Sequence, residues 1–348
     1  LLIFGFFGSR PLLRLLNTKP ELLDKATLYM QIYFCGMPAL ALYNFGNAVY
    51  SAIGNTKKPL YYLLFSGIVN VVLNLVFVIG FKMSVAGVAL ATIISQAVSA
   101  ALVTRSLMLM DGPTQLHLDR LAIKPHIMRM IIQIGLPAGI QSCMFSLSNV
   151  VIQSSVNSFG SIVIAGNAAG ANVGNFVYQA MNTFQQAVTC FAGQNIGARK
   201  PRRVLSSMYV SLFWALSFGV VFGVLSCVFG TQLLGLYSPD PAVIQVGLNR
   251  MYIVCGPYFL CGIMDVMTGV LRGVGYSLLP MIVSLMGACV FRIFWVMTIF
   301  AANRTMDCLM ISYPVSWALT FLVLVVIFAV LWKKKIRPRY TPEELAAR

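Results

Sequence analysis

Long apolar segments make up most of this chain and restrict the folds that are open to it. A helix that crosses a bilayer needs about 20 consecutive apolar residues. Nine segments reach that length, after a shorter apolar stretch that ends near Phe7. Because backbone groups in lipid must be hydrogen-bonded within their own segment, the sequence predicts an all-α integral membrane protein. The nine predicted spans lie near residues 27–53, 59–81, 85–110, 128–158, 162–194, 205–235, 247–272, 279–301 and 309–332.

Charged residues are few and are unevenly placed along the chain. They form 10% of the 348 residues, whereas soluble proteins contain about 25%. The formal net charge of +16 arises mainly in alternate loops, among them Lys57 and Lys58, the cluster at 199–203 and the tail at 333–339. Cytoplasmic loops of membrane proteins carry such an excess of Lys and Arg. We therefore expect a multi-pass protein of the inner cell membrane, with a cytoplasmic C-terminus and no nucleic-acid partner.

An internal repeat runs through the chain at a constant offset of 221 residues. Since this offset holds six predicted spans, an even number, both copies face the same way across the membrane, as a parallel repeat of six-helix halves. If each half has six spans, about two and a half of them precede the first residue, and the sequence is truncated at its N-terminus. The repeated residues are Leu12, Leu13, Leu15, Pro20, Met30, Ile32, Val49, Gly54 and Pro59, which recur as Leu233, Leu234, Leu236, Pro241, Met251, Ile253, Val270, Gly275 and Pro280.

Three uncharged polar residues lie inside the early spans. Asn70 and Asn74 are four residues apart and therefore share a helix face, and Thr92 lies in the next span. Polar groups at membrane depth need partners or water. The residues predict either hydrogen bonds between neighbouring helices or part of a cation pathway, and the spacing alone leaves both open.

Asp265 is the only carboxylate inside a predicted span, and Arg292 is a cation on the following span. A buried lone Asp must be paired, hydrated or protonated. A structural ion pair between Asp265 and Arg292 is one interpretation. A coupling group that alternately binds a cation and a partner is the other, because intramembrane ion pairs also serve as gates.

The span at 162–194 carries a stripe of amide side chains. Five of them follow helical spacing and lie on one face. A continuous polar stripe does not face lipid, so we expect it to line a water-accessible cleft for substrate. The five are Asn172, Asn175, Gln179, Asn182 and Gln186.

Other functional classes lack the residues they require. His117 and His126 are the only histidines, and the eight cysteines include no C-x-x-C pair, so we expect no metal site and no disulfide framework. We find no nucleophile–base pair, phosphate-binding loop or paired intramembrane acids, and we expect no enzyme. A scaffold that transports nothing remains an alternative for the chain as given.

Several sequence words together resemble the multidrug and toxic compound extrusion (MATE) transporters, and they cover essentially the whole chain. The most specific are GQNIGARKPRR at 193–203 and LRG-x-G-x(4)-P at 271–280, beside GNTKKP, NVVLN, IGLPAG and YPVSW. The resemblance implies twelve helices in two lobes around a central cleft, and export of organic, often cationic compounds in exchange for Na⁺ or H⁺. It divides the chain into a partial N-lobe at 1–110 (from the end of the third helix), a cytoplasmic linker at 111–127, a C-lobe at 128–332 and a basic tail at 333–348.

The resemblance also assigns individual residues. Asn70 and Thr92 match the N-lobe cation site of family members, but Asn74 stands where an Asp is often found. Phe145 stands where another branch of the family has a Glu. Asp265 is therefore the main candidate for ion coupling.

The resulting prediction is a monomeric efflux antiporter that works by alternating access. It acts on small organic molecules in the lipid bilayer and needs no cofactor beyond Na⁺ or H⁺. The alternative is a related flippase for a lipid-linked saccharide. Its cleft would need several basic residues for pyrophosphate, and only Arg292 and Arg250 qualify.

Overall fold

The computed structural model describes residues 2–15, 20–112, 114–342 and 344, and the regular elements within these ranges are all helical. Contacts divide the chain into two compact units, with the boundary between Ala122 and Ile123. This boundary lies inside the segment predicted to be a linker. The two units are described one at a time below.

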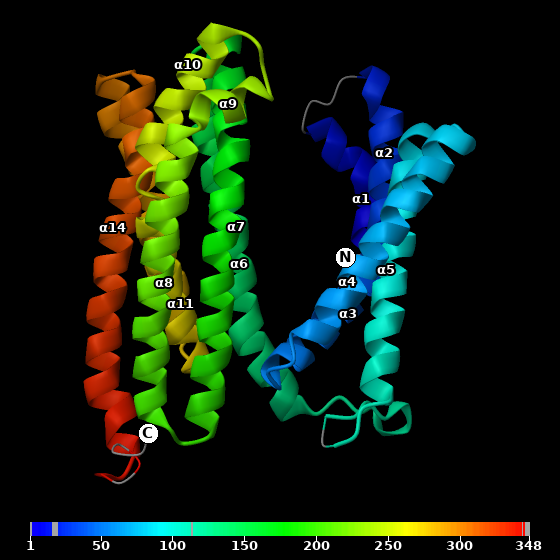
Figure 1. Ribbon diagram of the computed structural model, residues 1–348, viewed down its shortest axis with the longest axis vertical. Coiled ribbons are helices and arrows are strands. Elements are labelled where there is room, and N and C mark those ends of the chain that lie inside the picture. The colour runs from blue at the N-terminus through cyan, green and yellow to red at the C-terminus, as the bar shows by residue number, and fades with distance from the viewer. Residues whose placement is uncertain (1, 16–19, 113, 343, 345–348) are drawn as a thin grey trace. The chain divides into compact units, whose positions relative to one another are not determined.

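The first unit is a bundle around α5. Helix α5 packs against α2, α3 and α4, and α1 packs against α2 (Figure 1, blue to cyan). The buried apolar core is small and consists of Tyr43, Tyr50, Ala100, Val103 and Leu107. The elements are α1 (Leu2–Leu15), α2 (Pro20–Cys35), α3 (Met37–Ala52), α4 (Lys57–Asn74), the π-helix η1 (Leu75–Gly80), α5 (Ser84–Met108) and the 3₁₀ turn η2 (Leu118–Arg120).

The second unit is built around α11, which is buried along most of its length. It packs against α7, α8 and α14, and the long helices α7 and α8 run side by side (Figure 1). The elements are α6 (Pro125–Asn157), α7 (Ser161–Gly197), α8 (Pro201–Val228), α9 (Gly230–Gly235), α10 (Pro241–Arg250), η3 (Met251–Cys255), α11 (Tyr258–Gly273), α12 (Leu278–Ser284), η4 (Leu285–Val290), α13 (Phe291–Trp295), η5 (Val296–Phe300), α14 (Met306–Leu331), η6 (Trp332–Ile336) and η7 (Arg337–Arg339).

Six helices of the described residues are long and apolar enough to cross a membrane, or seven when one bent pair counts as a span. The bent pair is Pro241–Cys255 with Tyr258–Gly273, which meet at 42°. The break falls at Gly256 and Pro257, because proline cannot donate a helical hydrogen bond.

Two of the nine predicted spans, 27–53 and 162–194, are not among these candidate membrane helices, although both segments are helical. The span predicted at 27–53 is divided between two helices, because α2 ends at Cys35 and α3 begins at Met37. Pro38 in the first turn of α3 accounts for the break at Gly36. The span predicted at 162–194 lies in the continuous helix α7, and its amide side chains lower its mean hydropathy.

The repeat at an offset of 221 residues also has the same backbone geometry in both copies. Gly54 and Gly275 both adopt a positive φ, of 78° and 95°. Gly54 donates to the Ser51 carbonyl at 3.0 Å, and Gly275 donates to the Arg272 carbonyl at 2.9 Å. The two turns therefore end α3 and α11 in the same way, with a left-handed glycine.

The C-terminal tail folds back on the second unit. Arg199, which follows α7, forms an ion pair with Glu344 at 2.6 Å. The Thr341 backbone N–H and the Arg199 guanidinium hold the pKa of Glu344 below its usual value. The basic tail is therefore joined to the loop between α7 and α8.

Candidate functional site

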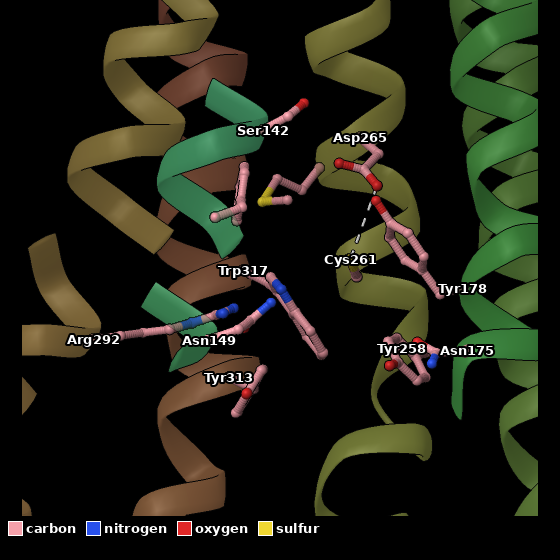
Figure 2. Close-up of a pocket in the computed structure, with 12 residues that line it drawn as sticks. Ser142, Asn149, Asn175, Tyr178, Tyr258, Cys261, Asp265, Arg292, Tyr313 and Trp317 are labelled. Carbon is pink, nitrogen blue, oxygen red and sulfur yellow. Dashed lines mark hydrogen bonds between the residues drawn. The ribbon is translucent and has the colours of Figure 1, made fainter. Parts of the chain in front are cut away.

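The second unit contains a cavity of about 330 Å³, which we call the charged cavity. Its walls come from α6, α7, α11, α13 and α14 (Figure 2). It opens along α6 and α7, where Ser142, Asn149 and Asn175 are exposed. The lining residues are Ser142, Phe145, Asn149, Asn175, Tyr178, Tyr258, Cys261, Met264, Asp265, Arg292, Tyr313 and Trp317.

The close packing of α11 places Asp265 at the cavity wall. A Cβ atom added to Gly269, four residues after Asp265, would lie 2.7 Å from the Gln185 carbonyl oxygen. Glycine at this position therefore lets α11 approach α7 closely. The same packing leaves Asp265 only 9% exposed. Asp265, which the sequence predicted to be a buried intramembrane acid, therefore lies on the wall of a cavity.

The surroundings of Asp265 leave its carboxylate without an ion pair. Among the described residues no cation lies within 4.0 Å of it, and Cys261 Sγ lies 4.0 Å from Oδ2 as a weak donor. Figure 2 shows the Tyr178 hydroxyl pointing toward the carboxylate. Arg272 lies two turns further along α11, and its Nη2 donates to Gln141 Oε1. An uncompensated carboxylate in this setting favours binding of a cation or a proton.

Arg292 does not form the predicted ion pair with Asp265. Its Nε donates to Ser316 Oγ at 2.9 Å, and its guanidinium lies 4.2 Å from the centroid of the Tyr313 ring. Figure 2 shows Arg292 and Asp265 at different sides of the cavity. The interpretation of a structural Asp265–Arg292 pair is therefore wrong, because α14 supplies Arg292 with a hydroxyl acceptor and an aromatic face instead.

Aromatic side chains form one wall of the charged cavity. Tyr258 and Trp317 are stacked with ring centroids 5.3 Å apart, and Tyr313 meets Trp317 edge to face at 5.8 Å. Rings in these arrangements present flat apolar surfaces that suit aromatic ligands. The sequence analysis noted the YPVSW word but did not assign Tyr313 and Trp317 to a site. Their spacing of four residues, which places both on one helix face, was the available signal.

One of the five predicted cleft amides lines the charged cavity. Asn175 does so, from α7. Asn172, Gln179 and Gln186 are exposed on the second unit, and Asn182 is half-buried. Gln186 Nε2 donates to Asn182 Oδ1 at 3.1 Å. The stripe is thus a polar face of α7, of which Asn175 reaches this cavity.

The first unit contains a second cavity, of about 540 Å³, which we call the neutral cavity because its lining residues are uncharged. Asn70 and Thr92 both line it, whereas Asn74 does not. Asn74 Nδ2 donates to the carbonyl and to Oδ1 of Asn70, both at 3.0 Å. The lining residues are Leu40, Tyr43, Asn44, Leu63, Ser66, Gly67, Asn70, Thr92, Ser95, Gln96 and Ser99.

The three polar residues of the early spans are only partly brought together. Asn70 Nδ2 donates to Ser95 Oγ at 3.3 Å, which joins α4 to α5. Thr92 instead donates to the Val88 carbonyl of its own helix at 2.9 Å. Asn70 and Thr92 therefore share a cavity, and Asn74 supports Asn70 from the same helix.

The two cavities occupy equivalent positions of the internal repeat. Adding 221 to five lining residues of the neutral cavity gives five lining residues of the charged cavity. In this comparison Asn44 is the counterpart of Asp265, a residue that sequence reasoning missed although the repeat offset points to it. The pairs are Leu40 and Cys261, Tyr43 and Met264, Asn44 and Asp265, Thr92 and Tyr313, and Gln96 and Trp317.

Comparison with known proteins places this architecture in a family. A sequence profile of the MatE family matches residues 1–76 and 137–298, which is more than half of the chain. The chain belongs to the MATE family. This is a family of transporters and not of enzymes, so the chain is a multi-pass membrane protein of a transporter family.

The chain is 31% identical over 293 residues to the probable multidrug resistance protein YpnP of Bacillus subtilis, covering 83% of this chain and 64% of YpnP. It is 25% identical over 346 residues to the probable multidrug resistance protein YoeA of the same organism, covering 96% of this chain and 74% of YoeA. The chain thus spans less than two thirds of the length of YpnP.

A solved structure also matches. The crystal structure of a mutant of the Vibrio cholerae MATE transporter VcmN superposes with a TM-score of 0.85 at 20% identity, covering 96% of this chain and 78% of VcmN. This similarity confirms the predicted all-α MATE fold.

Proposed function

We propose that this protein is a secondary active efflux transporter, which exports organic compounds in exchange for H⁺ or Na⁺. Membership of the MATE family supports transport, and the names of YpnP and YoeA support multidrug efflux. The observation that carries the proposal is Asp265, a buried carboxylate that faces a cavity without an ion pair among the described residues. Such a group binds a cation or a proton and releases it when a competing cation arrives.

In this proposal Asp265 couples the two fluxes because it holds one positive partner at a time. Binding of the ion or proton neutralises the carboxylate in one state, and an organic cation does so in the other. A ligand shifts a conformational equilibrium only by its differential affinity for the two states. Because the ion and the organic cation cannot occupy the carboxylate together, export of the organic cation is linked to the ion gradient. The amides of α7 and the Tyr258–Trp317 wall would bind the organic part of the substrate.

The proposal places the protein in the inner cell membrane as a monomer, with the basic tail in the cytoplasm. A flippase for a lipid-linked saccharide has less support from the described residues. Arg292 lines the charged cavity, but Arg250 lies outside its lining and donates to Asn167 Oδ1 at 2.8 Å. One arginine is a weak match for a pyrophosphate.

The test is export of a fluorescent organic cation from cells that express the full-length gene product. Wild type is compared with Asp265→Asn, while the Na⁺ and proton gradients are collapsed in turn. We expect export to stop when the coupling gradient is removed, and to fall by about 100-fold in Asp265→Asn because a neutral amide binds no ion. Asp307→Asn, an exposed acid at the start of α14, is the control and should export normally. Export by Asp265→Asn at the wild-type rate would disprove the coupling role.

A further inference from the structure

One end of the second unit has a group of basic side chains, which we call the basic surface. Figure 1 shows the turn between α7 and α8 and the end of α14 together at this end of the unit. Within the described residues of 196–207 and 331–344, Glu344 is the only acid. The basic surface consists of Arg199, Lys200, Arg202 and Arg203 around the turn, and of Lys333, Lys334, Lys335, Arg337 and Arg339 after α14.

The residues that follow α14 are folded onto the second unit. Ile336 is only 2% exposed and belongs to the buried apolar core, and Tyr340 packs against the same core. Arg199 Nη2 donates to the Arg339 carbonyl at 3.5 Å, in addition to the ion pair of Arg199 with Glu344. The two segments of the basic surface are therefore joined through Arg199, and both are part of the folded unit.

Much of the charge on the basic surface has no acidic partner in the described part of the chain. The lysines at 333–335 and Arg337 are exposed, and none of them lies within 4.0 Å of a described acid. Arg203, in the first turn of α8, is exposed in the same way. The surface therefore has an excess of positive charge that only a group outside the unit can offset.

The depth of the basic surface is that of the lipid headgroups. Helix α14 has 26 residues, which span about 39 Å, whereas the hydrocarbon core of a bilayer is about 30 Å thick. The lysines at 333–335 follow α14 within two residues, so they lie just outside the hydrocarbon. Trp332 beside them is half-buried and Tyr209 on α8 is exposed. Aromatic residues are enriched at the headgroup level, which agrees with this depth.

We propose that the basic surface binds the phosphate headgroups of anionic phospholipids, with the lysines at 333–335 and Arg203 among the contacts. Basic residues directly beside a membrane span attract anionic lipids, by about five-fold in affinity for each residue. A phospholipid fits better than a soluble phosphate, because its acyl chains stay in the adjoining leaflet and keep the headgroup close to the surface. This site is separate from both cavities, and it does not depend on the proposed efflux function.

Two lipids that differ in the net charge of their headgroups provide the test. Phosphatidylglycerol and phosphatidylcholine with identical acyl chains are added in equal amounts to the purified full-length protein in a non-ionic detergent. Native mass spectrometry then measures how much of each lipid is bound. We expect the wild type to bind phosphatidylglycerol about ten-fold more tightly. The preference should shrink as NaCl is added, because salt screens exposed charges.

Removal of the three lysines should abolish most of this preference. The triple glutamine variant at 333–335 should bind phosphatidylglycerol about ten-fold more weakly and phosphatidylcholine as before, because only the charged headgroup loses its partners. A triple arginine variant at the same positions keeps the charge and should keep the preference. Arg203→Gln tests the other segment of the surface and should weaken phosphatidylglycerol binding by about five-fold.

An excess of Lys and Arg also orients membrane proteins, so the control must separate a lipid site from charge in general. The triple variant Lys124→Gln, Arg129→Gln and Arg304→Gln removes the same charge from exposed positions of the second unit outside the basic surface. It should bind both lipids as the wild type does. Equal losses in this control and in the lysine variant would overturn the inference, because lipid binding would then follow net charge alone.

Two further outcomes would also overturn the inference. One is an unchanged preference for phosphatidylglycerol in the triple glutamine variant at 333–335. The other is displacement of phosphatidylglycerol by an equal concentration of glycerol phosphate, which has no acyl chains and would identify a site for soluble phosphates. Neither outcome bears on efflux, which is tested by export in the wild type and in Asp265→Asn.

Discussion

The neutral cavity and the charged cavity share a frame but differ in chemistry. Five lining positions correspond at an offset of 221 residues, and in both units the cavity wall combines a helix that ends at a left-handed glycine with a later, longer helix. At these positions Asn44 corresponds to Asp265, Thr92 to Tyr313 and Gln96 to Trp317. The repeat therefore conserves backbone geometry within the molecule, while the side chains separate an uncharged polar site from a charged aromatic one.

This difference separates a cavity that contains charged side chains from one that contains none. Amides and hydroxyls stay neutral across the physiological pH range, whereas a carboxylate can carry a negative charge. In the described part of the first unit, the cavity offers oxygen ligands but no charge of its own. The asymmetry between the two halves thus arises from a few side chains and not from the fold.

Exchanging the charge between the cavities should give the largest effect. The double variant Asp265→Asn with Asn44→Asp places a carboxylate at the repeat-equivalent position of the neutral cavity. If the cavities are interchangeable, gradient-driven export should recover at least about ten-fold over Asp265→Asn alone, because a titratable group again faces a cavity. Export assays under each collapsed gradient measure this.

The single variant Asn44→Asp is the necessary companion to this exchange. With Asp265 present it adds a second carboxylate, and we expect the stoichiometry of coupled ions to rise or export to slow. A double variant that exports no better than Asp265→Asn, despite normal membrane levels, would show that the equivalence is geometric only.

A matched pair of serines should give the next largest effect. Ser95 and Ser316 are repeat equivalents, and each donates to the carbonyl three residues earlier, at 2.8 and 2.7 Å. Ser95 Oγ accepts an amide N–H from Asn70 at 3.3 Å, whereas Ser316 Oγ accepts the guanidinium Nε–H of Arg292 at 2.9 Å. Ser316→Ala should cost about 2 kcal/mol of stability and Ser95→Ala about 1 kcal/mol, because hydrogen bonds to buried charges are stronger.

Thermal unfolding in detergent measures both serine variants under identical conditions. Ser207→Ala, at a half-buried position of α8, serves as the reference for loss of a hydroxyl that donates to a carbonyl of its own helix, here that of Arg203 at 2.7 Å. Equal losses of stability in Ser95→Ala and Ser316→Ala would contradict this prediction. They would mean that Arg292 Nε finds another acceptor when the Ser316 hydroxyl is removed.

The fold was largely predictable from the sequence, since hydrophobic length identifies helices that must satisfy their own backbone in lipid. The nine predicted spans all correspond to helical segments, although the helix breaks at Gly36 in the first one and at Gly256 and Pro257 in the one at 247–272. The interruptions were missed because apolar length carries no information on local backbone breaks. The π-helical segments, such as η1 and η5, were missed for the same reason.

The site was less predictable than the fold. Asp265 and Arg292 stood out, because charges inside spans are rare and costly. The sequence left open whether the two form an ion pair, since spacing along two helices gives their depth and not the direction of a long side chain. Asn149, Tyr258 and Asn44 were missed because single polar or aromatic residues in a span are common in packing. Only the three-dimensional cavity, or the repeat offset applied to Asp265, distinguishes Asn44.

A matched pair of glycines should give the smallest effect and tests the shared frame itself. Gly54 and Gly275 have positive φ, and a Cβ atom added at either position would meet no atom within 4 Å. Substitution by alanine should therefore cost only the left-handed backbone conformation, about 1 kcal/mol in each case. Gly135→Ala, at an open position within α6, should instead be neutral or slightly stabilising, because alanine favours helix. Thermal unfolding that gives equal losses at 54 and 275 supports one turn geometry used twice. A loss of stability at only one of them would show that the two halves share a sequence pattern but not the energetics of the turn. The correspondence between the two cavities would then be limited to their lining residues.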